Sequence, residues 1–337
     1  MAMKRLRRLA LDPIIGFGIH FLIAIVSRLS HRNLERLASF LSPLVAAVYP
    51  EGRKLVVANL RIVFPDWPEA RYVATYKECV RHSLDTFFRF LWFYRHPGEL
   101  AGVLDRTSQA ATDVLELSHS PNGAILISPH LGKFDLVAQC VASWGVDLHA
   151  VVHELRNPWA EAVAVKGREC HGLTVIPQHG AVRQMVKAMR AGKPVAILMD
   201  QNVRPHKGGV FTDFFGLPVT VSRVPAALAL RLKAPLFVGA CVQDGPGLVF
   251  VGRKVPFPAS ETCTEETLTH ELMAVHEELI RRYPEQYAWI YKRWRYIPGD
   301  APPEVAARYP YYAKVYVHPR AEDSQAGDTE EDAESSS

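Results

Sequence analysis

The chain lacks several features that mark common classes of protein. Its 337 residues include five cysteines, an odd number, and they are scattered without any Cys-x-x-Cys pair. This pattern indicates a reducing compartment and argues against a disulfide framework or a structural zinc site. There is also no Gly-x-Ser-x-Gly sequence, so the strained serine turn of an α/β hydrolase is not expected.

Metal ligands at a recognisable spacing are lacking as well. His149 and His153 are four residues apart, and His171 and His179 follow, but no cysteine or acid completes a zinc pattern. We therefore expect neither a metal nor another cofactor. Basic residues are spread along the chain without the interleaved aromatics of a nucleic-acid-binding motif, which argues against a nucleic-acid partner.

Long apolar runs are absent too. The longest, at residues 13–26, has about 14 residues, fewer than the ~20 needed to cross a bilayer. Four basic residues at positions 4, 5, 7 and 8 precede it. We expect an uncleaved helical membrane anchor over residues 1–30, lying at or dipping into the inner leaflet. A signal peptide and an ordinary core helix are the alternatives; no clean cleavage site follows the run.

Charge is distributed unevenly along the chain. The tail from residue 321 to 337 carries seven acids and no Lys or Arg, so removing it raises the formal net charge from +4 to +11. The preceding part is therefore basic and suits anionic lipid headgroups, a phosphorylated substrate such as coenzyme A, or nucleic acid. We expect the acidic tail to be disordered.

Alternating patterns predict an α/β fold. Strand-like runs at 124–127, 148–152, 173–176, 194–199, 236–242 and 248–252 are separated by helical stretches. Such alternation predicts a central, mostly parallel sheet flanked by helices. Before it, residues 33–49, 53–66 and 69–95 have helical periodicity, the last with many aromatics that favour a core or an acyl-chain groove. We divide the chain into an anchor (1–30), a main domain (31–300) and a C-terminal extension (301–337).

The most informative stretch runs from Ala124 to Asp135. A buried strand ends at Ser128-Pro129, His130 follows in a loop, and Asp135 lies five residues further on. Ligands in α/β folds gather at the carboxyl ends of strands. An imidazole can accept a proton from a hydroxyl near neutral pH, and a carboxylate on its other nitrogen fixes the tautomer. We therefore interpret His130 as a base and expect the carboxylate of Asp135 to reach back to it.

A second strand also ends on an acid, Asp200, followed by Gln201. Arg204, other cations and a glycine-rich stretch come next, which is what a site for a polar headgroup beside an acyl chain needs. Asp200 is equally compatible with a solvated strand end, and the cations taken singly with ordinary surface charge.

These segments together resemble the bacterial lipid A biosynthesis acyltransferases and the related phosphatidylinositol mannoside acyltransferases, over roughly residues 10–300. The resemblance is carried by these motifs: His130-Leu-Gly-Lys-Phe-Asp135, Asn59-Leu60 before Phe64-Pro65, Arg156-Asn157-Pro158, Asp200-Gln201, Phe211-x-x-Phe214-Phe215-Gly216, and the ending Pro284-Glu285-Gln286 to Trp294-Arg295.

The resemblance implies a glycerolipid-acyltransferase-like fold on the cytoplasmic face of the inner membrane. It further implies transfer of an acyl chain from acyl carrier protein or coenzyme A to a lipid hydroxyl, without a cofactor. The catalytic residues implied are His130, Asp135 and Asp200. The residues expected to bind substrate are Lys133, Arg156, Asn157, Arg204, Phe211, Phe215 and Gly216. Lipid A enzymes commonly have Glu where this chain has Asp135, whereas glycerolipid and mannoside enzymes commonly have Asp.

Two other functions fit the sequence. A lysophospholipid or glycerol-phosphate acyltransferase would share the base and the fold but take another acceptor. A non-catalytic, basic protein that binds anionic lipid at a membrane surface would use the surplus positive charge and leave His130 without a chemical role.

Overall fold

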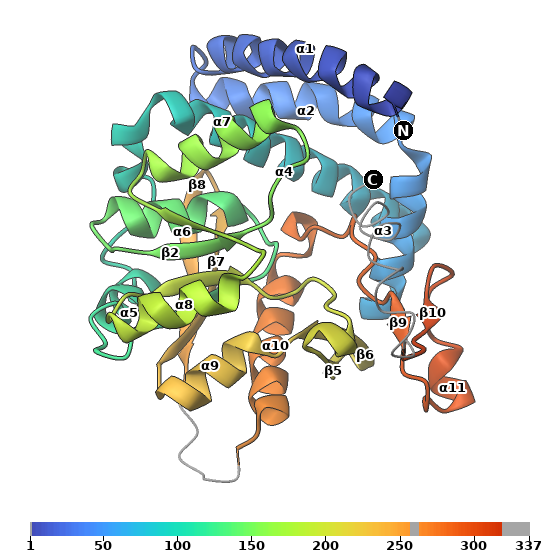
Figure 1. The fold of residues 1–337 in the computed structure, drawn as a ribbon. Helices are drawn as coiled ribbons and strands as arrows, with labels where there is room; N and C mark the ends of the chain where they lie inside the picture. Colours follow the sequence, from blue (N-terminus) through green and yellow to red (C-terminus); the bar gives the residue numbers. More distant parts are fainter. Residues whose placement is uncertain (1, 257–262, 319–337) are drawn as a thin grey trace.

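A six-stranded sheet forms the centre of the protein (Figure 1). The computed structural model describes residues 2–256 and 263–318, with side chains of the first helix described from residue 12. The sheet has the order β3-β2-β4-β1-β7-β8; its first five strands are parallel and β8 runs antiparallel to β7. Its strands are β1 (Ile125–Ser128), β2 (His149–Val152), β3 (Thr174–Pro177), β4 (Val195–Leu198), β7 (Leu236–Asp244) and β8 (Gly247–Val255).

Helices cover the sheet and extend beyond it. They are α1 (Ala2–Val26), α2 (His31–Val48), α3 (Pro50–Val63), α4 (Glu69–Arg95), α5 (Gln109–Leu117), α6 (Phe134–Ser143), α7 (Pro158–Glu169), α8 (Ala181–Arg190), α9 (Val224–Leu232), α10 (Glu265–Arg282) and α11 (Pro303–Ala306). Short 3-10 turns are η1 (Pro97–Gly102), η2 (Pro205–Lys207) and η3 (Pro284–Gln286). The remaining strands are β5 (Gly209–Phe214), β6 (Leu217–Ser222), β9 (Tyr296–Ile297) and β10 (Lys314–Val315).

The two faces of the sheet pack against different helices. Successive side chains of a strand point to opposite faces, so Ile125 and Ile127 share a core with α8, α9 and α10. Leu126 joins a second core with α5, α6 and α7, to which α1, α2 and α4 also contribute. The helices α1 and α2 therefore lie on the α6 side of the sheet, whereas α8 and α9 cover the other face.

Helix α1 lies at the top of Figure 1 and packs against α4 and α7. It buries Ile23 and Val26 but leaves large apolar side chains exposed, including Phe17 at 75% and Phe21 at 60%. Within the described ranges, no helix is both long and apolar enough to span a bilayer. The four basic residues at 4–8 lie where side chains are not described, and the acidic tail from 321 lies outside the described residues.

The predicted alternation of strands and helices is confirmed, with the six sheet strands close to their expected positions. One segment differs. The glycine-rich stretch that was expected to contribute to a headgroup site, without a predicted strand, forms an antiparallel hairpin, β5–β6. Its turn residues Phe215 and Gly216 have φ of 57° and 73°, the left-handed pair that a tight hairpin turn requires.

Candidate active site

The loop that carries His130 is held by segments distant in the sequence. After β1 the chain passes Pro129, and the carbonyl of His130 accepts a hydrogen bond from the Ala288 N–H at 2.9 Å. The Gly132 N–H donates to the Gln286 carbonyl at 2.9 Å. Gly132 has φ of +62°, and a Cβ there would collide with the carbonyl of Cys241, so only glycine fits this turn. The position of His130 is therefore set by β7 and the C-terminal segment.

His130 is oriented by Asp200, which follows β4 at the same edge of the sheet. Its Nδ1 lies 2.6 Å from Oδ1 of Asp200, and its backbone N–H donates to Oδ2 at 3.0 Å. The Tyr287 hydroxyl donates to the same Oδ2 at 2.9 Å. Because an ionised carboxylate can only accept, Nδ1 carries the hydrogen and Nε2 keeps its lone pair. This is the arrangement of a base with an orienting acid.

The charge of Asp200 is maintained although its side chain is only 2% exposed. Burial acts to raise the pKa of this carboxyl, but the charge and hydrogen bond of His130, with smaller effects of Arg293 and His276, bring the pKa well below its usual value. Burial and the neighbouring Asp200 carboxylate together hold the pKa of Tyr287 well above its usual value, so its hydroxyl stays a donor.

The other nitrogen of the imidazole faces a cavity. His130 is 17% exposed, and its Nε2 lies 3.2 Å from the amide nitrogen of Gln201. The adjoining cavity measures about 420 Å³. Its walls are mainly apolar and come from α1, α4, α7 and the segment after η3, and include Ile19, Phe87, Phe90, Leu91, Val163, Ala164 and Ile290. The base therefore lies beside a cavity whose walls suit a hydrocarbon chain.

Asp135 has a different partner from the one the sequence suggested. Its Oδ1 accepts hydrogen bonds from Nε and an Nη of Arg168 at 3.0 and 2.8 Å. The expected contact with His130 is therefore wrong for this structure, and Asp200 takes that place. Asp135 still lines the His130 cavity, as does Arg168. Both also line a smaller apolar cavity of about 80 Å³ between α6 and the sheet.

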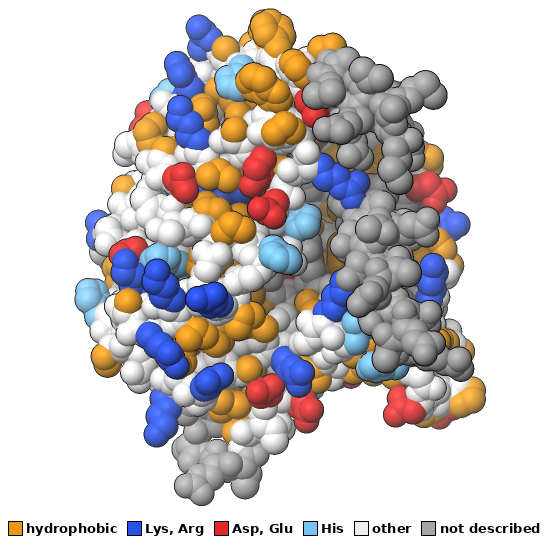
Figure 2. Space-filling model, viewed as in Figure 1, with side chains coloured by type: hydrophobic (Ala, Val, Ile, Leu, Met, Phe, Trp, Pro, Cys, Tyr) orange, Lys and Arg blue, Asp and Glu red, His pale blue; other side chains and the backbone are white. Residues whose placement is uncertain are grey.

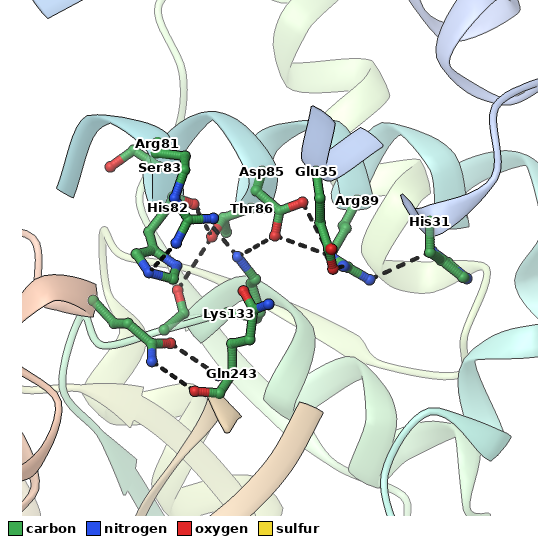
Figure 3. Close-up of polar contacts among 12 residues, drawn as sticks. His31, Glu35, Arg81, His82, Ser83, Asp85, Thr86, Arg89, Lys133 and Gln243 are labelled. Atoms are coloured by element: carbon green, nitrogen blue, oxygen red, sulfur yellow. Dashed lines mark hydrogen bonds and ion pairs between the residues drawn. The ribbon is translucent and has the colours of Figure 1, made fainter. Parts of the chain in front are cut away.

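Lys133, expected to bind substrate, is fully buried and bound elsewhere. Its ammonium lies 2.5 Å from Asp85 of α4, and Arg89 donates to the same carboxylate at 3.0 Å. Arg89 also pairs with Glu35 of α2 at 2.5 Å. Figure 3 shows this row of alternating charges running from α2 across α4 to the His130 turn. Lys133 thus joins elements of the fold, and its expected contact with substrate stays a prediction.

The charges in this row stabilise one another. Burial lowers the pKa of Lys133, partly offset by Asp85. Burial alone would raise the pKa of Asp85, but the two cations lower it overall. The cations favour the charged form of Asp85, and Asp85 favours the charged form of Lys133, so each makes the burial of the other tolerable.

Three further residues expected at a headgroup site are Asn157, Arg156 and Arg204. Asn157 caps α7, accepting from the N–H groups of Trp159 and Ala160 at 3.0 Å, and donates to Asp12 of α1 at 2.9 Å. Its side chain therefore has a structural role. Arg156 is exposed beside it, and Nε of Arg204 donates to the Tyr296 hydroxyl at 3.3 Å.

The aromatic motif belongs mainly to the hairpin. Phe215 is 6% exposed and lies under Arg281, with its N–H bound to Glu277. Phe211 packs its ring edge against Tyr316. Among the described lining of the His130 cavity, neither these residues nor Gly216 contributes. Their expected contact with substrate stays a prediction.

Sequence reasoning did not predict the roles of Tyr287, Gln201, Arg168 and Asp85. Tyr287 and Gln201 lie inside motifs that carry the family resemblance, so the sequence indicated their positions but not their hydrogen bonds to Asp200 and His130.

In the described part of the chain, no group of three or more His, Cys, Asp or Glu residues is placed to hold a metal ion.

Comparison with known proteins gives a match over most of the chain. A family model described as bacterial lipid A biosynthesis acyltransferase matches residues 3–296. A lipid A biosynthesis lauroyltransferase of Escherichia coli (strain K12) is 21% identical over 303 residues, covering 86% of this chain and 92% of that protein. A lipid A biosynthesis acyltransferase 2 of Shigella flexneri is 24% identical, but the match spans 52% of this chain and only 57% of that protein.

A phosphatidylinositol mannoside acyltransferase of Mycobacterium tuberculosis (strain CDC 1551 / Oshkosh) is 25% identical over 58% of this chain and 62% of its own length. The family match extends from α1 through β9 and includes both acids and the histidine of the site. The chain is therefore an acyltransferase and belongs to the bacterial lipid A biosynthesis acyltransferase family.

Proposed function

We propose that the protein transfers a fatty acyl chain from a thioester to a hydroxyl of a lipid A precursor at the cytoplasmic face of the inner membrane. The observation that carries this proposal is the His130–Asp200 pair at the edge of an apolar cavity, with Nε2 of His130 on the side away from Asp200. The match to the E. coli lauroyltransferase over nearly its whole length supports a lipid A precursor as acceptor.

The reaction begins with His130 as general base. Its Nε2 takes the proton of the acceptor hydroxyl as that oxygen attacks the thioester carbonyl carbon, and the imidazolium that forms is stabilised by Asp200. Gln201, which now contacts Nε2, gives way to the hydroxyl. The carbon–sulfur bond then breaks, and the imidazolium returns the proton to the departing thiolate. An ester and a free thiol result.

The developing oxyanion needs hydrogen-bond donors. Helix α6 begins at Phe134, and Phe134 and Asp135 both line the cavity. The first N–H groups of a helix have no partner within it and carry a partial positive charge. These two amides are the donors we assign to the oxyanion.

The acyl chain is assigned to the apolar cavity beside His130. The walls of this cavity are apolar and therefore suit a hydrocarbon chain; they include Phe87 and Phe90 of α4, Val163 of α7 and Ile290. The donor is a thioester of acyl carrier protein or of coenzyme A.

One observation favours a second acceptor class. The fifth residue after His130 is Asp135, as is common in glycerolipid and mannoside enzymes, and the mycobacterial mannoside enzyme is 25% identical to this chain. A lysophospholipid or phosphatidylinositol mannoside acyltransferase would use the same base and cavity.

An acceptor competition assay tests the proposal. The purified protein in detergent micelles receives one radiolabelled acyl thioester and equal amounts of a lipid A precursor, lysophosphatidate and a phosphatidylinositol mannoside. We expect label mainly in the lipid A precursor because the family match covers the whole site. Label mainly in either of the other lipids would reject lipid A as the acceptor, and label in none would reject acyl transfer.

We further propose that α1 holds the enzyme on the membrane surface. The exposed side chains of Ile14, Phe17 and Phe21 form an apolar face, and contiguous patches of this kind mark interaction surfaces. Figure 2 shows apolar side chains gathered at the top of the molecule, over α1.

The double variant Phe17→Ser/Phe21→Ser tests this. Since each ring contributes roughly 2 kcal/mol when buried in lipid, we expect vesicle affinity to fall by about 10²-fold or more in a flotation assay. A matched control, Val315→Ser/Val317→Ser, removes two exposed apolar side chains near β10 and should leave binding unchanged. Equal binding of both variants would reject the anchor.

A further inference from the structure

Arg293 is a buried cation whose guanidinium has no hydrogen-bond partner among the described residues. The residue is 1% exposed, and all three nitrogens of its side chain are unpaired there. Its guanidinium lies over the ring of Phe214, 5.3 Å from the ring centre. An arginine keeps its charge in proteins, and burying an unpaired charge is costly. Packing alone does not account for such a group, because an apolar side chain of similar volume would fill the same space without this cost.

The segment that carries Arg293 is bound to the loop after β4, which also carries Asp200. Asn202, two residues after Asp200, donates from its N–H and from its side chain to the Tyr291 hydroxyl, at 3.1 and 3.3 Å. The Arg293 N–H in turn donates to the Tyr291 carbonyl at 2.8 Å. Burial acts to raise the pKa of Asp200, His130 lowers it most, and the charge of Arg293 lowers it further. The guanidinium is therefore near enough to act on the carboxylate.

The His130–Asp200 pair needs a positive charge beside it when it is ready to react. His130 is a base only while its imidazole is neutral, and Asp200 is then a negative charge that is 2% exposed. Without a cation nearby, such a pair takes up a proton from solvent. A proton on the imidazole occupies the lone pair of Nε2. A proton on the carboxyl is donated to Nδ1 and leaves the imidazole hydrogen on Nε2, so the base is lost in either case.

The other described titratable groups around the pair do not supply this charge. The hydroxyl of Tyr287 is a neutral donor to Asp200. Burial lowers the pKa of His276 of α10, which lies behind Asp200, and lowers the pKa of His82 on the cavity wall to about 3. The charged groups near the His130 turn are bound in pairs, Asp135 with Arg168 and Lys133 with Asp85.

We propose that Arg293 is a positioning residue for acyl transfer: its buried charge compensates Asp200 while His130 is neutral, and so keeps the pair in the form that accepts a proton at Nε2. The proposal deepens the proposed function and rests on it, because the compensation matters to the reaction only if His130 is the base. A direct salt bridge to Asp200 would compete with His130 for the carboxylate oxygens, whereas a charge that acts from behind does not.

Replacing Arg293 with methionine tests the proposal, because the pair must then take up a proton to compensate Asp200. We expect the acidic limb of the kcat/KM profile, where protonation removes activity, to move to higher pH by about one pH unit. Activity at a given pH on this limb should fall about tenfold and return to near the wild-type value as the pH is raised. The matched variant Arg293→Lys keeps a cation and should move the limb less than half as far.

Trp294→Phe is the control for lost packing. Trp294 is fully buried next to Arg293 in the sequence, and its replacement leaves every charge in place, so the pH profile should match the wild type even if the unfolding temperature falls. A second control uses the Asp200→Asn background, which has no carboxylate to compensate. Adding Arg293→Met there should change kcat by less than about 2-fold.

An unmoved acidic limb in Arg293→Met, an equal shift in Arg293→Lys or Trp294→Phe, or a further large loss in the Asp200→Asn background would each overturn the proposal. If Arg293→Met does not fold, Arg293→Gln carries the same prediction. If neither folds, Arg293 is needed for stability and the proposal is overturned as well.

A wild type that is inactive with every donor and acceptor would overturn the proposed acyl transfer instead. The imidazole ¹⁵N resonances of His130, assigned by comparison with His130→Ala, then still test the charge compensation. We expect Arg293→Met to hold an extra proton on the pair at a pH where the wild type does not, and identical titrations of the two proteins would overturn the role of Arg293.

Discussion

Replacing His130 with alanine is expected to lower kcat for acyl transfer by at least about 10³-fold, because it removes the imidazole that Asp200 orients at the edge of the apolar cavity. Because alanine leaves the buried Asp200 carboxylate without the imidazole, the thermal unfolding temperature should fall and kcat is compared per folded molecule, whereas vesicle binding should stay close to wild type. Single-turnover assays with saturating thioester measure the chemical step directly. Retained turnover would remove His130 from the mechanism.

Replacing Asp200 and Asp135 separately tests which of the two acids orients His130. Asp200→Asn removes the charge that stabilises the His130 imidazolium and offers an amide where Nδ1 needs an acceptor, so kcat should fall by about 10²–10⁴-fold. Asp135→Asn keeps a carbonyl oxygen for Arg168 and leaves the His130 hydrogen bonds intact, so its loss of kcat should be smaller. If Asp135→Asn proved the more damaging of the two, the assignment of Asp200 as the orienting acid would be wrong.

Replacing Lys133 with methionine should destabilise the fold more than any other single change proposed for this protein. The methionine fills a similar volume but leaves the row from Glu35 to Asp85 with one buried negative charge in excess. Removing one member of a buried ion pair costs about 3–5 kcal/mol of the free energy of unfolding. Urea unfolding followed by far-UV circular dichroism measures this loss.

The double variant Lys133→Met/Asp85→Leu provides the control. It removes both charges and leaves Arg89 paired with Glu35, so stability should recover to within about 1–2 kcal/mol of wild type. A double variant as unstable as Lys133→Met would show that the loss comes from packing and not from the unpaired carboxylate. The activity per folded molecule of this double variant, compared with the wild type, then measures how much Lys133 contributes to positioning the turn that carries His130.

The sheet could be predicted from the sequence because its strands are short, β-branched and bounded by turn residues, which are local signals. The β5–β6 hairpin was not predicted because its glycines and the cations before it suggested a headgroup site, although Val210 to Phe214 and Leu217 to Val221 fit two short strands around a turn. The residue pattern of these two neighbouring segments was therefore compatible with paired strands, but their glycine and cation content led to a different interpretation.

The partner of His130 could not be chosen by spacing alone. Asp135 is five residues away in sequence, but α6 turns its side chain toward Arg168 on α7. Asp200 is distant in sequence, yet the parallel pairing of β1 with β4 brings the two strand ends together. Likewise, the residues next to Lys133 in the sequence do not indicate that its ammonium pairs with Asp85 of α4 in the core. Contacts of this type depend on tertiary packing, which residue spacing does not encode.

The hydrogen bonds that fix the His130 turn have a consequence for biosynthesis. Gln286 and Ala288 hold that turn, and the side chain of Asn59 in α3 is bound to the carbonyl of Trp289, 230 residues later. On the ribosome, the earlier strands and helices emerge well before these anchors do. The nascent chain therefore cannot complete its reactive centre until residues near 290 have left the exit tunnel, and products of premature termination upstream of them should be inert even if their sheet has formed.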